Sequence, residues 1–370
     1  MNNKTRILVC PLNWGLGHAS RMVPIINQLL KRNHNVIIAA DGVALEYLKN
    51  EFPFLKWFVL PQYRVKYSNK NTQLFTMLRL LPALIIYSIK EHFLLKRLLK
   101  REQIDCVISD NRYGLWNKSI YSVFITHQLN VLFPGVFKVF EPISRWIVKK
   151  IIRQYNECWV PDFEDDNNLS GILSHIYNYP TVFYIGPLSR FTKESSLNQN
   201  KTKYDILIIL SGPEPQRTIF EQLVYRQLLI KDYKVAIVRG ANSKKVLEST
   251  TNISVFEMVN SHELLSLVNE SKVVVCRSGY SSVMDLVALQ KTAVIVPTPG
   301  QTEQEYLATY LYNKGLFYTL FQKDFCIDKA IRNKIDFPMD FEKSRDEILM
   351  KRIDNLEKVL KNEKHNKSHN

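Results

Sequence analysis

Residues 6–21, RILVCPLNWGLGHASR, join an apolar run to a turn with two glycines and then to a segment with helical spacing. A buried strand, a glycine turn and a helix are the first unit of an open α/β sheet. Further apolar runs alternate with amphipathic segments along the chain, so we expect parallel sheets with crossover helices. The expected strands are 6–12, 35–40, 55–60, 105–109, 122–126, 157–160, 204–210, 234–238, 253–256, 272–276 and 292–296, with helices at 19–32, from Gln216, from Ser281 and at 342–360.

The chain is predicted to form two domains, because its 370 residues exceed the size at which one core stops growing. The polar stretch 189–203, with several turn-forming residues, is the expected linker. We therefore expect two Rossmann-like, doubly wound α/β domains facing a cleft, over 1–187 and 188–340. A C-terminal helix over 341–361, with the first domain as its candidate packing surface, and a flexible tail over 362–370 complete the prediction.

The amino-acid composition and net charge limit the classes of partner that we expect the chain to bind. The chain is 46% hydrophobic and 23% charged, which is typical of a globular protein, and its net charge is +15, of which residues 1–187 hold +10. A basic half could face nucleic acid, anionic lipid or a phosphorylated substrate; with no RNA-binding signature or zinc finger, we expect no nucleic acid. Five cysteines without metal-ligand spacing, and an N-terminus unlike a signal peptide, predict a cytoplasmic protein with reduced thiols.

Two segments of the first half combine apolar groups with cations: Leu74–Arg101 and Val136–Tyr155. The longest uncharged run, Leu80–Ile89, is too short to span a bilayer, which needs about 20 apolar residues. One interpretation is two amphipathic helices that pack on a sheet with solvated charges. The other is a membrane-surface face, where aromatic groups enter the headgroup layer and cations meet anionic lipid.

The turn after the first strand holds Gly15, Gly17 and His18. Glycines beside a helix N-terminus allow close backbone approach to a ligand, and a histidine there can act as a general base near neutral pH. A tight turn with an incidental histidine remains an alternative. A nicotinamide site with Asp41 on the ribose is another, but Ser20 occupies the third glycine position of that fingerprint.

A second group of polar residues follows the strand at 272–276. Ser278, Gly279, Ser281 and Ser282 stand where a turn leads into a helix, and Asp285 lies one turn further on. Helix-start amides and hydroxyls suit a diphosphate, and a carboxylate suits a ribose diol, although a serine-rich helix start can also be only a cap. A polar loop, Pro297–Gln304, follows the next strand.

These motifs resemble GT-B-fold glycosyltransferases of family 28, typified by the N-acetylglucosaminyltransferase of the lipid-linked peptidoglycan precursor. The resemblance is nearly end to end. It makes 1–187 the acceptor-binding domain and 188–340 the nucleotide-sugar domain, with Asp285 on the ribose and no cofactor beyond a UDP-sugar donor. It further implies acceptor-side roles for Gly15 and the segment Thr126–Asn130, which includes His127 and Asn130. Nucleotide-sugar contacts are implied for Gly17, Arg190, Ser211, Gly212, Met258, Ser278, Gly279, Ser281, Ser282, Asp285 and Gln304.

Departures from the family pattern limit what is carried over. Pro213 lacks the hydroxyl of the family's glycine-rich loop, Asp285 is shorter than the usual glutamate, and Glu303 replaces a histidine. The opening Asn13-Trp14 also differs, so peptidoglycan synthesis is not implied. Gly-x-Gly-His-x-x-Arg is also similar to the loop of a UDP-sugar hydrolase on the same fold.

The leading hypothesis is an inverting, metal-independent transferase with His18 as base and a lipid-linked or envelope acceptor at an anionic membrane surface. Asp110 and His127 follow strands, so either could orient His18 or contact acceptor. The acidic cluster Asp162, Asp165 and Asp166 is interpreted as a solvated loop rather than a metal site. A UDP-sugar hydrolase or epimerase and a non-catalytic sugar-nucleotide-binding protein remain as alternatives.

Overall fold

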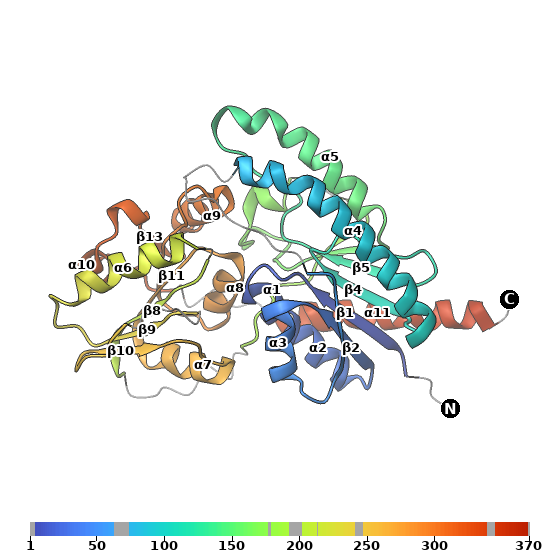
Figure 1. Ribbon diagram of the computed structural model, residues 1–370, viewed down its shortest axis with the longest axis horizontal. Coiled ribbons are helices and arrows are strands. Elements are labelled where there is room, and N and C mark those ends of the chain that lie inside the picture. Colours follow the sequence, from blue (N-terminus) through green and yellow to red (C-terminus); the bar gives the residue numbers. More distant parts are fainter. Residues whose placement is uncertain are drawn as a thin grey trace. The chain divides into compact units, whose positions relative to one another are not determined.

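The computed structural model describes residues 4–62, 74–176, 179–191, 202–212, 214–240, 247–338 and 345–368. These residues form two compact units, each around one parallel sheet (Figure 1). The first unit contains the described residues up to 62, together with 77–190 and 345–368, and the second is centred on 202–338. The predicted fold class, two parallel-sheet α/β domains, is confirmed.

The first unit holds a seven-stranded sheet in the order β3-β2-β1-β4-β5-β6-β7. Its strands are β1 Arg6–Pro11, β2 Asn35–Ala40, β3 Lys56–Val59, β4 Cys106–Asp110, β5 Tyr121–Ile125, β6 Glu157–Val160 and β7 Val182–Tyr184. Its helices are α1 Leu16–Ser20, α2 Met22–Lys31, α3 Gly42–Glu51, α4 Leu74–Glu102, α5 Glu141–Ile152 and α11 Arg345–Ser368, with the 3₁₀ turns η1 Gly135–Phe140 and η2 Gly171–Leu173. Helices α4 and α5 lie on one side of this sheet and α2 and α11 on the other (Figure 1).

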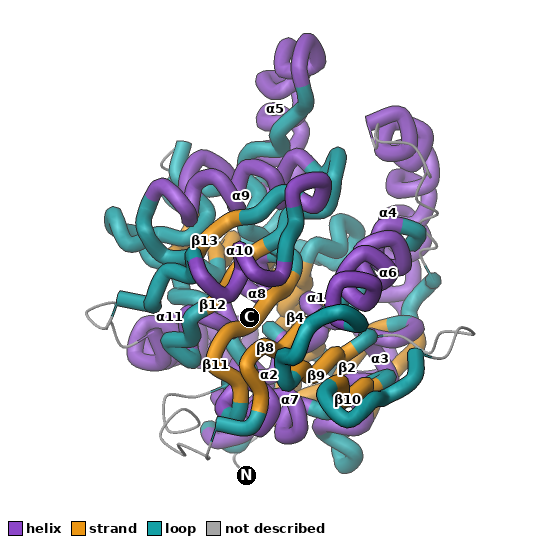
Figure 2. The backbone as a smooth tube through the Cα atoms, turned by 90° about the vertical axis from the view of Figure 1, so that its left-hand side faces the viewer, coloured by secondary structure: helices purple, strands orange, loops and turns teal. Residues whose placement is uncertain are grey.

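The second unit holds a six-stranded sheet in the order β10-β9-β8-β11-β12-β13. Its strands are β8 Tyr204–Ile209, β9 Val235–Val238, β10 Ile253–Phe256, β11 Ser271–Cys276, β12 Ala293–Ile295 and β13 Tyr318–Thr319. Its helices are α6 Gln216–Leu228, α7 Ser261–Asn269, α8 Tyr280–Ala288, α9 Thr302–Asn313 and α10 Ile327–Arg332, with the 3₁₀ turn η4 Gln322–Asp324. Figure 2 shows the strands as orange segments of the backbone tube.

Both sheets are parallel because their central strands are apolar on both faces. Strands β1, β4 and β8 consist largely of side chains with no exposed surface, which only helices on both faces can achieve. In each sheet the strand order reverses direction once, between β1 and β4 and between β8 and β11. Loops that leave the carboxyl ends of strands at such a reversal form the usual ligand-binding crevice of this architecture.

Several elements differ from the sequence expectations. The helix expected at 19–32 is split into α1 and α2, because Pro24 has no N–H to donate to the Ser20 carbonyl one turn earlier. Helices α3, α7, α9 and α10 and the short strands β7 and β13 were not expected. The expected start of the last helix at Glu342 lies outside the described residues, and the chain stays helical to Ser368, beyond the expected end at Leu360.

The C-terminal helix α11 returns to the first unit and packs against α2. The Arg352 guanidinium pairs with the buried carboxylate of Glu157 on β6, donating from Nε at 3.0 Å, and lies 3.6 Å from the ring centre of Phe183 on β7. Glu157 also accepts the Tyr121 hydroxyl at 2.7 Å and the Trp159 indole N–H at 2.6 Å. A residue near the C-terminus thus neutralises a carboxylate inside the first core.

Candidate active site

The turn between β1 and α1 ends at Gly15, the N-cap of α1, whose φ of 85° lies in the left-handed region that glycine adopts without strain. The carbonyl of Gly17 accepts the Arg21 N–H at 3.2 Å and the Ser20 hydroxyl at 3.1 Å. This short helix turns the side chain of His18 toward Asp110, the last residue of β4. Because β1 and β4 are the strands at which the sheet order reverses, the two residues meet at the expected crevice.

His18, Asp110 and Arg21 form one buried network. The Nδ1 of His18 lies 3.1 Å from Asp110 Oδ2 and 2.8 Å from Arg21 Nη2. Arg21 Nε donates to Asp110 Oδ2 at 2.7 Å, Nη2 contacts Asp110 Oδ1, and Nη1 lies 3.3 Å from Nδ1 of His127. The His18 side chain keeps 15% of its surface exposed, whereas Asp110 is fully buried and Arg21 is 1% exposed. Only the histidine is therefore open to a ligand.

Burial, more than the neighbouring charges, holds His18 neutral. Burial lowers the pKa of His18, Asp110 raises it and Arg21 lowers it again, with a lowered net value. Burial alone would raise the pKa of Asp110, but the charges and hydrogen bonds of Arg21 and His18 lower it to about 2. An ionised carboxylate beside a neutral imidazole is the arrangement of a general base with a group that orients it.

Arg21 is the residue here to which the sequence analysis assigned no role. Its position three residues after His18 on a helical segment places both side chains on one face, which is the signal that could have found it. A fully buried guanidinium beside a carboxylate also fixes the position of Asp110, because two donors meet both carboxylate oxygens.

Asp41, the candidate ribose acid of a nicotinamide site, is used inside the core instead. It is 1% exposed and pairs with the buried Arg112, which also binds Glu91 at 2.6 Å and the Pro11 carbonyl at 2.8 Å. Its second oxygen accepts the Asn13 amide at 3.0 Å. The carboxylate therefore supports the β1 turn, and nothing in its surroundings favours the nicotinamide alternative.

The other predicted residues of the first unit lie at separate places. His127 follows β5 and reaches the network through Arg21, as described above. Asn130 is 2% exposed; its N–H binds the Leu173 carbonyl at 2.9 Å and its side-chain oxygen accepts Arg145 Nη1 at 3.4 Å. Arg190 lies against α3, with Nη1 3.4 Å from the Tyr47 hydroxyl.

In the second unit, Ser211 and Gly212 follow β8, and Ser278 and Gly279 follow the adjacent β11. The two loops leave neighbouring strands at the reversal of strand order, so the structure brings these residues to one edge. Gly279 is the N-cap of α8; a Cβ added there would meet nothing within 4 Å, so the helix start faces open space. An open helix N-terminus favours an anion. Pro213 lies outside the described residues.

Ser278 and Gln304 act on the loops that surround this edge. The buried Ser278 hydroxyl donates to the Gln304 carbonyl at 2.8 Å, and the Gln304 side-chain oxygen accepts the Thr298 N–H at 2.9 Å. Ser278 therefore ties the loop after β11 to the start of α9, and the Gln304 side chain ties the loop after β12 to the same helix start. The hydroxyl of Thr298 is buried and has no hydrogen-bond partner among the described residues.

The remaining predicted donor-side residues are accessible. Ser281, Ser282 and Asp285 are half-buried on the first turns of α8, and Met258, after β10, is 51% exposed. Arg277, to which the sequence analysis gave no separate role, is 1% exposed and donates to the carbonyls of Pro297 and Gln216 and to the Gln322 side chain. Burial lowers the pKa of Arg277 to about 10.

The carboxylates of the acidic cluster after β6 do not gather as the ligands of one metal site would. Asp162 is buried and accepts the N–H groups of Leu169 at 2.7 Å and Ser170 at 2.9 Å. Asp165 accepts the N–H of Asn167 at 3.0 Å within the same loop. These hydrogen bonds therefore stabilise the conformation of the loop that contains the cluster. Across the described ranges, no three histidine, cysteine or acidic side chains gather as a metal site would require.

Comparison with known proteins bears on the fold and on the second unit. Residues 207–361 match the family model of the glycosyltransferase family 28 C-terminal domain. The UDP-N-acetylglucosamine–N-acetylmuramyl-(pentapeptide) pyrophosphoryl-undecaprenol N-acetylglucosamine transferase of Sulfurihydrogenibium sp. is 28% identical over 171 residues, which are 45% of this chain and 47% of that protein. The chain spans about half the length of the curated relatives of this kind.

Two other similarities extend over more of the chain. An uncharacterized glycosyltransferase of Methanosarcina acetivorans is 22% identical over 329 residues, 84% of this chain and 82% of that protein. The crystal structure of the kitacinnamycin glycotransferase superposes with a TM-score of 0.67 at 13% identity, over 97% of this chain and 100% of that one. The predicted resemblance to this group is confirmed: the two sheets have the GT-B fold, and residues 207–361 are similar to the glycosyltransferase family 28 C-terminal domain.

Proposed function

We propose that the chain is an inverting, metal-independent glycosyltransferase that moves a sugar from a UDP-sugar to a lipid-linked or cell-envelope acceptor. The observation that carries the proposal is the pair of His18 and Asp110 at the reversal of the first sheet, 3.1 Å apart and locked by Arg21. Every protein named in the comparison is a glycosyltransferase, which supports the class of reaction.

In the proposed reaction, Nδ1–H of His18 donates to Asp110 and Nε2 accepts the proton of the acceptor hydroxyl as its oxygen attacks the anomeric carbon. Asp110 then stabilises the imidazolium that forms, because its carboxylate is ionised and already in place. Burial, and to a smaller extent Arg21, lowers the pKa of His18 before the reaction, so the free base predominates at neutral pH.

The donor is proposed to lie at the second sheet, with its diphosphate at the start of α8. Amides at Gly279–Ser282 and the hydroxyls of Ser281 and Ser282 would meet the leaving UDP, and Arg190 would add a cation, so that no metal is required. Asp285 would accept bonds from the ribose diol and the loop at Met258 would face the uracil. The half-buried helix start with open space before Gly279 supports this placement.

The donor assignment is tested by UDP titration. UDP should raise the melting temperature of the protein through ligand linkage, and Asp285→Ala should weaken UDP binding. Asp324→Ala, in η4 of the same unit, provides a matched control that removes a carboxylate elsewhere. Unchanged UDP affinity in Asp285→Ala would remove the ribose contact from the proposal, and preference for a purine nucleotide would remove the uracil contact.

The reaction itself is tested with a panel of UDP-sugars, scoring UDP release with and without membrane extract. Release that strictly depends on extract supports a transferase with an envelope acceptor. Release without extract indicates instead a UDP-sugar hydrolase or epimerase on the same fold, because water then takes the place of the acceptor. No turnover together with tight nucleotide binding would favour a non-catalytic sugar-nucleotide-binding protein.

We also propose that the protein works on the cytoplasmic side of the membrane, through η1 and α5. These elements expose Val136, Val139, Phe140, Ile143, Trp146 and Ile147. Lys150 lies 3.9 Å from the Trp146 ring, and Lys149 follows on the same helix. Apolar side chains beside cations are the composition of an interfacial helix. Among the described helices, none is both long and apolar enough to cross a bilayer.

A further inference from the structure

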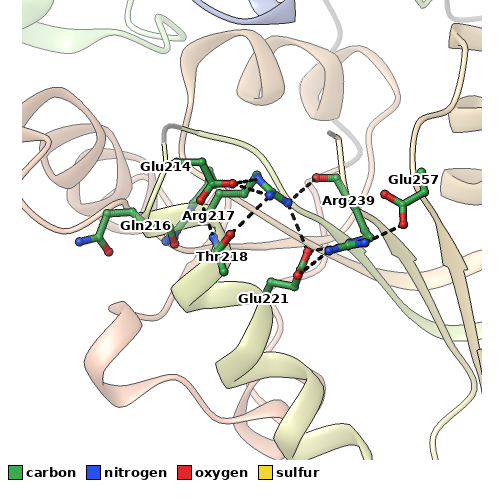
Figure 3. Close-up of polar contacts among 8 residues, drawn as sticks. Glu214, Gln216, Arg217, Thr218, Glu221, Arg239 and Glu257 are labelled. Atoms are coloured by element: carbon green, nitrogen blue, oxygen red, sulfur yellow. Dashed lines mark hydrogen bonds and ion pairs between the residues drawn. The ribbon is translucent and has the colours of Figure 1, made fainter. Parts of the chain in front are cut away.

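Five charged residues of the second unit form a chain of alternating sign, Glu214–Arg217–Glu221–Arg239–Glu257 (Figure 3). Arg239 donates to both oxygens of Glu221, each at 2.8 Å, and to Glu257 Oε1 at 2.6 Å. Arg217 donates to Glu221 Oε2 at 3.2 Å and to Glu214 Oε1 at 2.8 Å. Glu221 is therefore shared by the two guanidinium groups and links both ends.

The centre of this chain is buried and its ends are exposed. The side chains of Arg239, Glu221 and Arg217 are 0%, 3% and 6% exposed, whereas Glu257 and Glu214 are 45% and 55% exposed. The hydrogen bonds to Glu221 raise the pKa of Arg239, so this guanidinium stays charged throughout the ordinary pH range. Buried, bidentate guanidinium–carboxylate contacts hold geometry more strictly than surface pairs do.

The two exposed ends belong to different loops of the same edge. Glu214 follows Ser211 and Gly212 in the loop after β8, and Glu257 precedes Met258 in the loop after β10. Arg239 follows β9, the strand that lies between these two. The charged chain thus crosses the carboxyl ends of three adjacent strands and connects two loops that are distant in sequence.

The charges of the network do not favour direct binding of phosphate. Two guanidinium groups face three carboxylates, so the network carries no surplus positive charge, and its guanidinium donors already hold protein oxygens. The network therefore holds the loops in position rather than attracting an anion. Loops held in place before a ligand arrives lose less conformational entropy on binding.

We propose that Arg239 and Glu221 are positioning residues of the nucleotide site, which hold the loop at Met258 and the loop at Gly212 in one arrangement for a nucleoside diphosphate. The inference rests on the proposed function, because it takes this edge as the place where the nucleotide binds. Beyond that function, the two loops are coupled through the buried Glu221. A change at either exposed end should therefore reach the other loop.

The first experiment uses Glu257→Ala in the full-length protein, with UDP as the titrant in calorimetry. The side chain is half-exposed and Arg239 keeps both bonds to Glu221, so folding should survive. UDP affinity should fall about tenfold, the usual size of a coupling between sites. Glu257→Gln, which retains an oxygen for Arg239, should recover most of the affinity. Asp205→Ala removes a carboxylate that binds Lys272 at the opposite end of the same sheet, and should bind UDP as wild type does.

The second experiment tests the coupling with a double-mutant cycle. If the charged network connects the two loops, the double variant Glu214→Ala with Glu257→Ala should lose little more UDP affinity than whichever single variant loses more. Strictly multiplicative losses would refute the coupling, and wild-type affinity in Glu257→Ala would refute the positioning role altogether. Failure of wild type and Asp205→Ala to bind UDP would instead refute the proposed function, on which the inference depends.

Discussion

Replacing Arg21 with methionine removes the guanidinium that holds Asp110 and His18 while keeping a long, unbranched side chain. Asp110 is fully buried, and Arg21 donates to both of its oxygens, so the variant leaves a carboxylate in the core without its cation. Breaking one side of a buried pair costs about 3–5 kcal/mol in the free energy of unfolding. For a unit of this size, that corresponds to a fall in melting temperature of roughly 10 °C.

The pH dependence gives the sharper test. Burial is the largest influence on the pKa of Asp110 and raises it, whereas Arg21 is the strongest influence that lowers it. Without the guanidinium, the folded-state pKa of Asp110 should therefore rise above its ordinary value of 3.8. A group with a raised folded pKa contributes stability below its unfolded pKa and loses it as the pH rises through the folded value. His18 adds a change of the same sign, since losing Arg21 raises its pKa as well.

Relative to wild type, the stability deficit of Arg21→Met should accordingly widen as the pH rises from about 2, the folded-state pKa of Asp110 in wild type, through the raised folded-state pKa of Asp110 in the variant. Thermal unfolding followed by circular dichroism at several pH values measures this difference. Arg32→Met, which removes a partly exposed pair with Asp354, is the matched control and should lose at most about 1 kcal/mol. A melting temperature of Arg21→Met equal to that of Arg32→Met, or a deficit that stays constant with pH, would refute the reasoning.

Three further predictions concern other parts of the molecule. His18→Ala should lower kcat by about 10²–10⁴ with unchanged UDP affinity, and EDTA should have little effect; full activity, or rescue by Mn²⁺ after chelation, would contradict the mechanism. Lys149→Glu with Lys150→Glu should reduce sedimentation with anionic vesicles, since each cation contributes about 1 kcal/mol to membrane binding at low salt. The control, Lys358→Glu with Lys361→Glu on α11, should leave sedimentation unchanged. Equal binding of both variants would exclude η1 and α5 as the membrane face. Thr298→Val should raise the free energy of unfolding of the unliganded protein by about 1 kcal/mol, because it removes a buried hydroxyl without a described partner; a loss of stability in urea titration would show that the hydroxyl is bonded.

The sequence predicted the two sheets because their strands are apolar runs with recognisable turns, as at 204–210 and 272–276. It could not predict β13, which has two residues, or the break at Arg21, which depends on one missing N–H at Pro24. The prediction that Asp110 could orient His18 agrees with their contact, although the role itself is still a prediction.

Other parts of the candidate site depend on contacts far apart in sequence. Arg21 meets Asp110 across 89 residues, and Arg239 meets Glu221 across 18, so no local pattern records either pair. The family resemblance implied ligand contacts for Ser278 and Gln304, and the structure shows that their side chains also bond neighbouring loops. Residue types at helix starts indicate possible donors, but tertiary packing decides which of them a loop already uses.

The Arg352–Glu157 pair affects the order in which parts of the protein can fold during synthesis. A ribosome releases the chain from its amino end, so Glu157 emerges long before the arginine that neutralises it, 195 positions later. Until Arg352 emerges, the nascent first unit carries a carboxylate in its core with Tyr121 and Trp159 as its donors among the described residues. A polypeptide that stops at residue 190 should therefore remain loosely packed around β6, and supplying residues 345–368 as a separate peptide should tighten it.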